Sequence, residues 1–241
     1  MKRVILAVAL PVILTLAFGL LLLTGRVALN HPAQPVHGVD VSHYQGEIDW
    51  PLLAEQDIRF AFVKATEGSG FADGTFEANW SGARAAGLRT GAYHFFSYDS
   101  PAERQAANFI SRVPVEADAL PPVIDVEFYG DYAKHPAPTE TVVQQLREMV
   151  DALAARYGTK PILYATGRAY RLYLAQGFDD CDIWIRSVYT EPKLPDGRAW
   201  TFWQYTDKGR LRGTHGVEEA IDLNVFRGTE AEFEAYPRRQ Q

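Results

Sequence analysis

The sequence has little of several features that define whole classes of protein. It contains one cysteine in 241 residues, Cys181, which excludes an intrachain disulfide framework and is expected to be a small buried apolar side chain. It has no cluster of lysine and arginine, and its formal net charge is −6. Because phosphate contacts dominate nucleic-acid binding, we expect no nucleic-acid partner. No histidine pair has the spacing of a metal site, and we expect neither a metal nor a cofactor.

Charge is also missing from a long run at the N-terminus. After Lys2 and Arg3, the residues from Val4 to Leu23 contain no charged side chain, over about the length that spans a bilayer. Residues 1–25 are predicted to be an uncleaved signal anchor, because the run exceeds a typical signal-peptide core, with a cleaved signal peptide as the alternative. Residues 26–36 are expected to be a short tether. The basic residues before the run predict an exported body, anchored to the membrane or secreted after cleavage.

The remaining chain alternates short apolar runs with helical patterns, without repeats or low-complexity segments. Strands are predicted over residues 37–42, 59–66, 89–98, 121–128, 160–166, 181–187, 200–206 and 220–226. Helices are predicted over residues 50–56, 75–86, 101–112 behind Ser100 as N-cap, and 139–157 before Gly158.

Eight strands are enough to close a barrel, and their alternation with helices predicts parallel pairing. Helices become scarce after Ser187, so the last strands should be less regular and partly antiparallel. The expected fold is α/β, an irregular TIM-like β/α barrel. The barrel domain is expected over residues 37–230, followed by a C-terminal tail over 231–241, and the protein is expected to be a monomer.

Two acids interrupt the apolar run PPVIDVEF, residues 121–128. Side chains alternate across a strand, so Asp125 and Glu127 should share one face while their apolar neighbours occupy the other. In a β/α barrel, the C-terminal ends of the strands surround the ligand. This strand is therefore expected to present both carboxyl groups to a functional site.

Three further acids are predicted to reach the same rim. Asp40 lies late in the first strand and Glu67 follows the second, whereas Asp222 comes near the start of the last run and fits less well unless that strand is reversed. Any one of them alone would more often cap a turn. Several acids on one rim indicate a site, because unpaired buried carboxylates are costly.

Aromatic residues fall within the same strands: Tyr93, Phe95, Tyr164, Trp184, Trp203 and Tyr205. Core packing should account for about half of them. The others would rim an acid-rich pocket, which suits a carbohydrate, since sugar rings stack on aromatic faces and sugar hydroxyls bind carboxylates. His43 and His94, also near the rim, are expected to be hydrogen-bonded structural residues.

Six motifs resemble, in order and spacing, those of glycoside hydrolase family 25, the Chalaropsis-type lysozymes. They are GVDVSHYQGEIDW, FVKATEG, GAYHFF, LPPVIDVE, ILYAT and FWQYTDKG…AIDLNVF, and the resemblance runs from about Gly38 to Gly228. It implies an irregular β/α barrel with N-acetylmuramidase activity. Such an enzyme hydrolyses the β-1,4 bond between N-acetylmuramic acid and N-acetylglucosamine, so its partner is the glycan strand of peptidoglycan.

The resemblance also implies roles for individual residues. Glu127 matches the general acid, Asp125 its partner in the DxE motif, and Asp40 and Asp222 the further acids of the site. The residues at substrate-contacting positions are Lys64, Glu67, Tyr93, Tyr164 and Trp203. One departure is Arg186 in WIRSVYTEP, which stands where the family more often has a small residue.

Glycoside cleavage requires an acid that protonates the leaving oxygen and a negative group that supports the oxocarbenium-like transition state. Glu127, crowded by neighbouring acids, is expected to hold its proton to unusually high pH, and Asp125 to stay ionised. The spacing does not choose between a covalent nucleophile, water activation and attack by the substrate's own acetamido oxygen. We favour the last route, with Asp125 orienting the amide and the anomeric configuration retained.

Two alternatives from other classes remain open. A metal-dependent barrel hydrolase would use the same carboxylates as oxygen ligands of Mg²⁺ or Ca²⁺. A non-catalytic glycan-binding module would retain the fold without turnover. The hydrolase is preferred because every carboxylate of the motif set is present.

Overall fold

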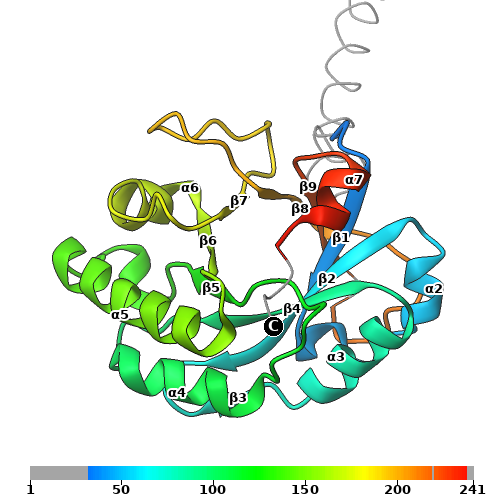
Figure 1. Cartoon of the computed structure of the whole chain (residues 1–241), viewed down its shortest axis with the longest axis horizontal. Coiled ribbons are helices and arrows are strands. Elements are labelled where there is room, and N and C mark those ends of the chain that lie inside the picture. Colours follow the sequence, from blue (N-terminus) through cyan, green and yellow to red (C-terminus); the bar gives the residue numbers. More distant parts are fainter. Residues whose placement is uncertain (1–31, 219, 238–241) are drawn as a thin grey trace, which may run out of the picture.

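The computed structural model describes residues 32–218 and 220–237 (Figure 1). The predicted anchor over residues 1–25 and most of the predicted tether lie outside the described residues. Within these two ranges, none of the helices combines the length and the apolar character needed to cross a membrane.

The strands form one sheet that closes on itself. They are β1 (Val36–Val41), β2 (Ile58–Glu67), β3 (Phe71–Ala72), β4 (Arg89–Phe95), β5 (Val123–Val126), β6 (Ile162–Thr166), β7 (Ile183–Arg186), β8 (Phe202–Gly209) and β9 (Ile221–Phe226). All eight predicted strands are present, and β3 adds a short strand antiparallel to the end of β2. Pairing of β1 with both β2 and β9 closes an eight-stranded barrel, which confirms the predicted fold class.

The direction of the last barrel strand differs from that of the others. The pairs from β1–β2 through β7–β8 are parallel, whereas β9 is antiparallel to both β8 and β1. The predicted irregular end of the barrel is thus confirmed. Reversal brings the start of β9 to the rim where the parallel strands end, as the position of Asp222 requires.

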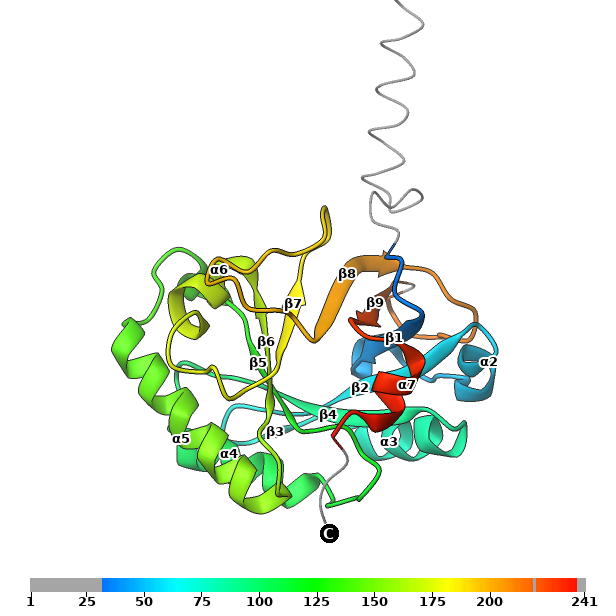
Figure 2. The ribbon, with the colours of Figure 1, turned by 45° about the horizontal axis from the view of Figure 1, so that its top comes forward.

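Helices cover the outside of the barrel, with α3, α4 and α5 along one side (Figure 2). The helical elements are η1 (His43–Gln45), α2 (Trp50–Ala54), α3 (Phe76–Ala85), α4 (Ala102–Arg112), η2 (Gly130–Ala133), α5 (Thr139–Tyr157), α6 (Gly167–Ala169), the π-helical turn η3 (Tyr170–Leu174) and α7 (Glu230–Ala235). Helix α5 ends at Gly158 in a left-handed conformation, φ 70°, as predicted. The predicted N-cap of α4 is wrong: the extended backbone of Pro101 occupies that position, one residue after Ser100.

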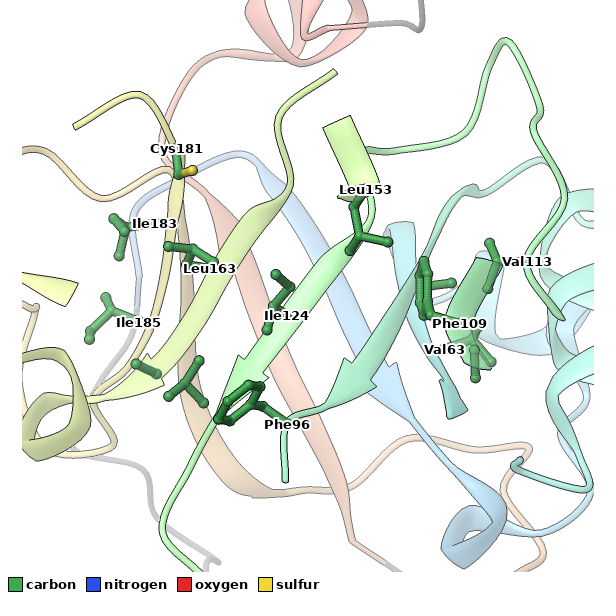
Figure 3. Packing of buried hydrophobic residues seen from close by; sticks show 14 of the residues in the cluster. Val63, Phe96, Phe109, Val113, Ile124, Leu153, Leu163, Cys181, Ile183 and Ile185 are labelled. Atoms are coloured by element: carbon green, nitrogen blue, oxygen red, sulfur yellow. The ribbon is translucent and has the colours of Figure 1, made fainter. Parts of the chain in front are cut away.

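Alternation along each strand divides the apolar side chains into two layers. Outward-facing residues such as Ile124, Leu163 and Ile183 belong to one buried cluster with Phe109 and Leu153 of the helices (Figure 3). The single cysteine, Cys181, is buried in this outer layer, as expected.

Inward-facing aromatic rings fill the other layer, inside the barrel. Phe62 stacks on Trp184 with ring centroids 4.5 Å apart, and Phe60 contacts Phe202 edge to face. Gly38 is required here, because a Cβ at its position would lie 2.4 Å from the ring of Phe60. The interior is therefore a packed aromatic plug, with the carboxyl-rich end of the barrel above it.

The segment after residue 230 belongs to this plug. Phe233 and Tyr236 are buried in the inner cluster, where the Phe233 ring lies 5.5 Å from that of Phe60. The expected tail over 231–241 therefore begins too early. Helix α7 covers the inner aromatic rings, and the barrel domain extends at least to Tyr236.

Candidate active site

A pocket of about 200 Å³ opens at the C-terminal ends of the parallel strands. Seven of the nine predicted site residues line it: Asp40, Lys64, Tyr93, Asp125, Glu127, Tyr164 and Asp222. They come from six strands of the barrel, so closure of the sheet brings together residues that are distant in the sequence.

The other two predicted site residues lie elsewhere. Glu67 does not line the pocket but pairs with Lys64 at its edge, Oε2 to Nζ 2.7 Å. The placement of Trp203 in the site is wrong. Its ring packs in the outer layer, 5.7 Å from Trp200, and its Nε1 donates to the carbonyl of Ser187. Strand alternation instead points the next residue, Gln204, into the pocket.

The DxE pair has the predicted orientation. Asp125 and Glu127 both face the pocket, whereas Ile124 and Val126 pack in the outer layer. The Asp125 side chain is buried, and its Oδ1 has no hydrogen-bond partner within the described residues. A buried carboxylate oxygen without a donor is costly. Asp125 Oδ1 thus has its hydrogen-bonding capacity unused at the centre of the site.

The pKa of Glu127 is raised as expected, whereas that of Asp125 is raised against expectation. Burial raises the pKa of Glu127, Asp40 raises it further, and the charge of Arg186 opposes the shift. Burial, rather than repulsion, is thus the largest cause of the predicted increase. For Asp125 the surroundings oppose the expected ionised form, because burial and the charge of Glu127 raise its pKa well above the ordinary range and Lys64 only partly opposes them.

The remaining two acids form a pair across the reversed strand. Asp40 and Asp222 stand directly opposite each other in the β1–β9 ladder. Burial, then the charge of Asp40 and a hydrogen bond to it, raises the pKa of Asp222 to about 10. Two carboxyl groups this close cannot both ionise at low cost, so the pair shares one proton at neutral pH.

Two buried amides hold this carboxyl pair. Gln204 Nε2 donates to Oδ2 of both Asp40 and Asp222, each at 3.0 Å, and Asn224 Nδ2 donates to Asp40 Oδ2 at 2.7 Å. Because amide N–H groups already point at these oxygens, the oxygens are poorly arranged to bind a cation. In the part of the chain that the structure describes, no three His, Cys, Asp or Glu side chains are arranged as a metal site.

Aromatic residues of the inner layer orient the two amides in turn. Tyr164 Oη donates to Gln204 Oε1 at 2.8 Å, and Trp184 Nε1 donates to Asn224 Oδ1 at 2.8 Å. The same Tyr164 hydroxyl lies 3.4 Å from Glu127 Oε1. One chain of contacts thus joins the carboxyl pair on β1 and β9 to the DxE pair at the end of β5.

Gln204 and Asn224 are the site residues that the sequence analysis missed. Asn224 follows Asp222 by two positions, and Gln204 follows the inward-facing Phe202 by two. The alternation that identified the DxE pair was therefore also a signal for these two amides.

His94 is structural, as expected. Its Nδ1 lies 2.7 Å from Thr66 Oγ1 and its Nε2 lies 3.0 Å from Gln105 Oε1. Burial lowers the pKa of His94 to about 4, so the ring is neutral at physiological pH. It points into the outer layer and does not line the pocket.

The barrel and its carboxyl-rich pocket are typical of the glycoside hydrolases that use a β/α barrel. The family model described as Glycosyl hydrolases family 25 matches residues 39–214, and the chain belongs to this family.

Individual relatives agree with this assignment. A family 25 glycosyl hydrolase from Bacillus anthracis has a similar structure, with a TM-score of 0.83 and 53% identity, over 87% of this chain and 97% of that one. The uncharacterized protein YegX of Escherichia coli O157:H7 is 37% identical over 215 residues, 87% of this chain and 76% of its own length. Lysozyme M1 of Streptomyces globisporus is 32% identical, over 81% of this chain and 69% of that protein.

The shared proton of the carboxyl pair predicts how stability depends on pH. Asp222 holds a proton to about pH 10 in the folded protein, against an unfolded value near 3.8. The folded state binds more protons between these limits, so this contribution is full below the unfolded pKa and is lost as pH rises through the folded pKa. Asp222→Asn replaces the proton with a permanent amide donor. The free energy of unfolding should then fall less steeply with pH, by about 1.4 kcal/mol per pH unit.

Urea denaturation of the parent and the variant at pH 5, 6, 7 and 8 measures this slope. Asp131→Asn, in an exposed aspartate outside the pocket, is the matched control and should keep the slope of the parent. Equal slopes for Asp222→Asn and the parent would contradict the shared proton.

Proposed function

We propose that this protein is a peptidoglycan hydrolase that cleaves the β-1,4 bond between N-acetylmuramic acid and N-acetylglucosamine. The observation that carries the proposal is the DxE pair, with Asp125 in β5 and Glu127 directly after it, in a pocket that three further acids also line: Asp40, Glu218 and Asp222. Membership of glycosyl hydrolase family 25 and the similarity to Lysozyme M1 support it.

Glu127 is the proposed general acid. Its raised pKa keeps the carboxyl protonated closer to neutral pH, where it transfers its proton to the leaving glycosidic oxygen. Once ionised, Glu127 is stabilised by the charge of Arg186, which lowers its pKa, and by the nearby hydroxyl of Tyr164. Burial thus favours the protonated form of Glu127, and the charge of Arg186 favours its ionised form.

Asp125 is the proposed partner of the substrate's acetamido group. Its buried Oδ1 has no hydrogen-bond partner in the described chain, and an acetamido N–H donated to this oxygen would supply one. A donor at this position favours the ionised carboxylate, so substrate binding lowers the raised pKa of Asp125. The oriented acetamido oxygen then attacks the anomeric carbon as the glycosidic bond breaks, which leads to retention.

The carboxyl pair and its amides have a supporting role in this scheme. Asp40 accepts hydrogen bonds from Gln204 and Asn224, which favour its ionised form, while Asp222 carries the shared proton. A single negative charge at this position faces the positive charge that develops on the sugar ring. The amides fix that charge in place, so little reorganisation is needed during the reaction.

Glu127→Gln tests the activity and the acid together. The full chain, purified in detergent, is incubated with peptidoglycan, and new reducing ends are identified by mass spectrometry. The parent should release muramic acid reducing ends, and the variant should turn over at least about 100-fold more slowly because it lacks the transferable proton.

Glu140→Gln, the same change in an exposed residue of α5, is the control and should behave as the parent does. Unfolding midpoints establish that each variant is folded. A folded parent that binds peptidoglycan but releases no ends would contradict the hydrolase and identify a glycan-binding module.

Asp125→Asn tests the route of the reaction. Loss of the carboxylate that stabilises the oriented acetamido group should reduce kcat by about 100-fold or more. Proton NMR of the first products formed by the parent should show the β-anomer, as retention requires. Early appearance of the α-anomer would reject the acetamido route.

We also propose that the body is exported and held at the membrane by residues 1–25. The uncharged run after two basic residues supports this, and so does a substrate that lies outside the cytoplasm. The full chain should sediment with membranes and resist a high-salt wash, whereas the chain shortened to residues 36–241 should not. Recovery of the protein from the medium with its leader removed would show instead a cleaved signal peptide.

A further inference from the structure

A second pocket lies beside the active site on the same rim of the barrel. Its volume is about 490 Å³, and it is formed by residues that follow β6 and β7. Arg186, at the end of β7, stands between the two pockets: it lines the second one, while its charge lowers the pKa values of Glu127 and Asp40 in the first. A ligand that contacts Arg186 in the second pocket would therefore touch the residue whose charge acts on the catalytic acid.

Hydrogen bonds on both sides hold the walls of this pocket. Arg198 donates to the carbonyls of Leu174 and Phe178 and to the hydroxyl of Tyr170, and it pairs with Asp196 at 2.9 Å. These bonds fix the segment before β8 to the π-helical turn η3. The pocket is therefore largely formed before any ligand enters it.

The start of the connecting segment is also held. The Ser187 hydroxyl donates to the carbonyl of Thr190 at 2.7 Å, and the Ser187 carbonyl accepts from Trp203 Nε1 at 2.8 Å. Trp203, which was predicted to lie in the active site, thus helps to hold the segment that lines the second pocket.

The charge of the second pocket is opposite to that of the first. Arg171 and Lys193 are exposed, and within the described ranges neither forms an ion pair. Arg186 pairs with Asp207, and Glu191 is the single acidic residue in the lining. A cationic pocket therefore flanks an anionic active site, in a protein whose formal net charge is −6.

We propose that the second pocket binds the carboxylate-bearing peptide attached to the lactyl group of muramic acid. This inference rests on the proposed function, because only a peptidoglycan substrate carries such a peptide next to the bond that is cleaved. Guanidinium and ammonium groups recognise carboxylates, and arginine does so in a two-pronged geometry. The pocket thus makes the enzyme selective for glycan strands that retain their peptides.

The test compares two substrates and two double variants of the full chain in detergent. One substrate is intact peptidoglycan, and the other is the same material after an amidase has removed the peptides and the lactyl carboxyl groups that this hydrolysis leaves have been converted to amides. Arg171→Gln with Lys193→Gln removes the two positive charges of the pocket that form no ion pair in the described ranges. Arg104→Gln with Arg112→Gln, on the exposed side of α4, removes the same charge elsewhere.

The pocket variant should raise KM for intact peptidoglycan about fivefold, as expected for two solvent-exposed ion pairs, and leave kcat unchanged. KM for the stripped glycan should not change, and the α4 variant should match the parent on both substrates. Equal effects of the pocket variant on both substrates, or no effect on either, would overturn the inference.

A binding measurement separates this inference from the proposed function. A soluble muramyl peptide has no glycosidic bond to cleave, so its affinity, measured by calorimetry, does not depend on catalysis. The parent should bind it more tightly than the pocket variant and more tightly than the same compound with amidated carboxyl groups. Equal affinities would refute a carboxylate site even in an active enzyme, whereas the expected difference in an inactive protein would refute the hydrolase alone.

Discussion

The crowding of buried Asp40 and Asp125 with half-buried Glu127 and Asp222 at one end of a closed barrel is the constraint on which the site depends. Below them the interior is filled by aromatic rings, which offer few polar partners. The protein meets the cost in three ways: a proton shared between Asp40 and Asp222, amide donors from Gln204 and Asn224, and positive charge from Lys64 and Arg186. Asp125 Oδ1 is a buried oxygen that has no donor among the residues the structure describes.

The missing hydrogen bond to Asp125 Oδ1 connects stability with function. Its burial raises its pKa, and a donor from a bound substrate would lower it again. In this account, binding energy from the acetamido group is used to ionise and orient the carboxylate at the moment it is needed. The free protein carries the cost of the buried acid, and the complex relieves it.

Much of the fold could be predicted, since the determining signals are local. Apolar runs and their alternation with helices predicted all eight barrel strands, and the position of Asp222 required the reversed strand that the structure contains. Helix α7 was missed because its burial depends on the aromatic plug that Phe233 meets, which no local pattern describes. Trp203 was misplaced by motif position alone, whereas alternation along β8 would have selected Gln204.

The position of Arg186 at the end of β7 has a structural consequence. Arg186 divides the rim into an anionic site and a cationic neighbour, and it acts on the catalytic acid from the boundary. A small residue at this position would leave Glu127 without its main opposing charge. Arg186 therefore acts on both the acid and the adjoining pocket.

The most direct test of the account is a crystal structure of the Glu127→Gln variant with a peptidoglycan tetrasaccharide bound. We expect the acetamido nitrogen of the sugar before the cleaved bond within hydrogen-bond distance of Asp125 Oδ1, and the bridging oxygen beside residue 127. A glycan bound with its acetamido group turned away from Asp125, or bound outside this pocket, would contradict the account.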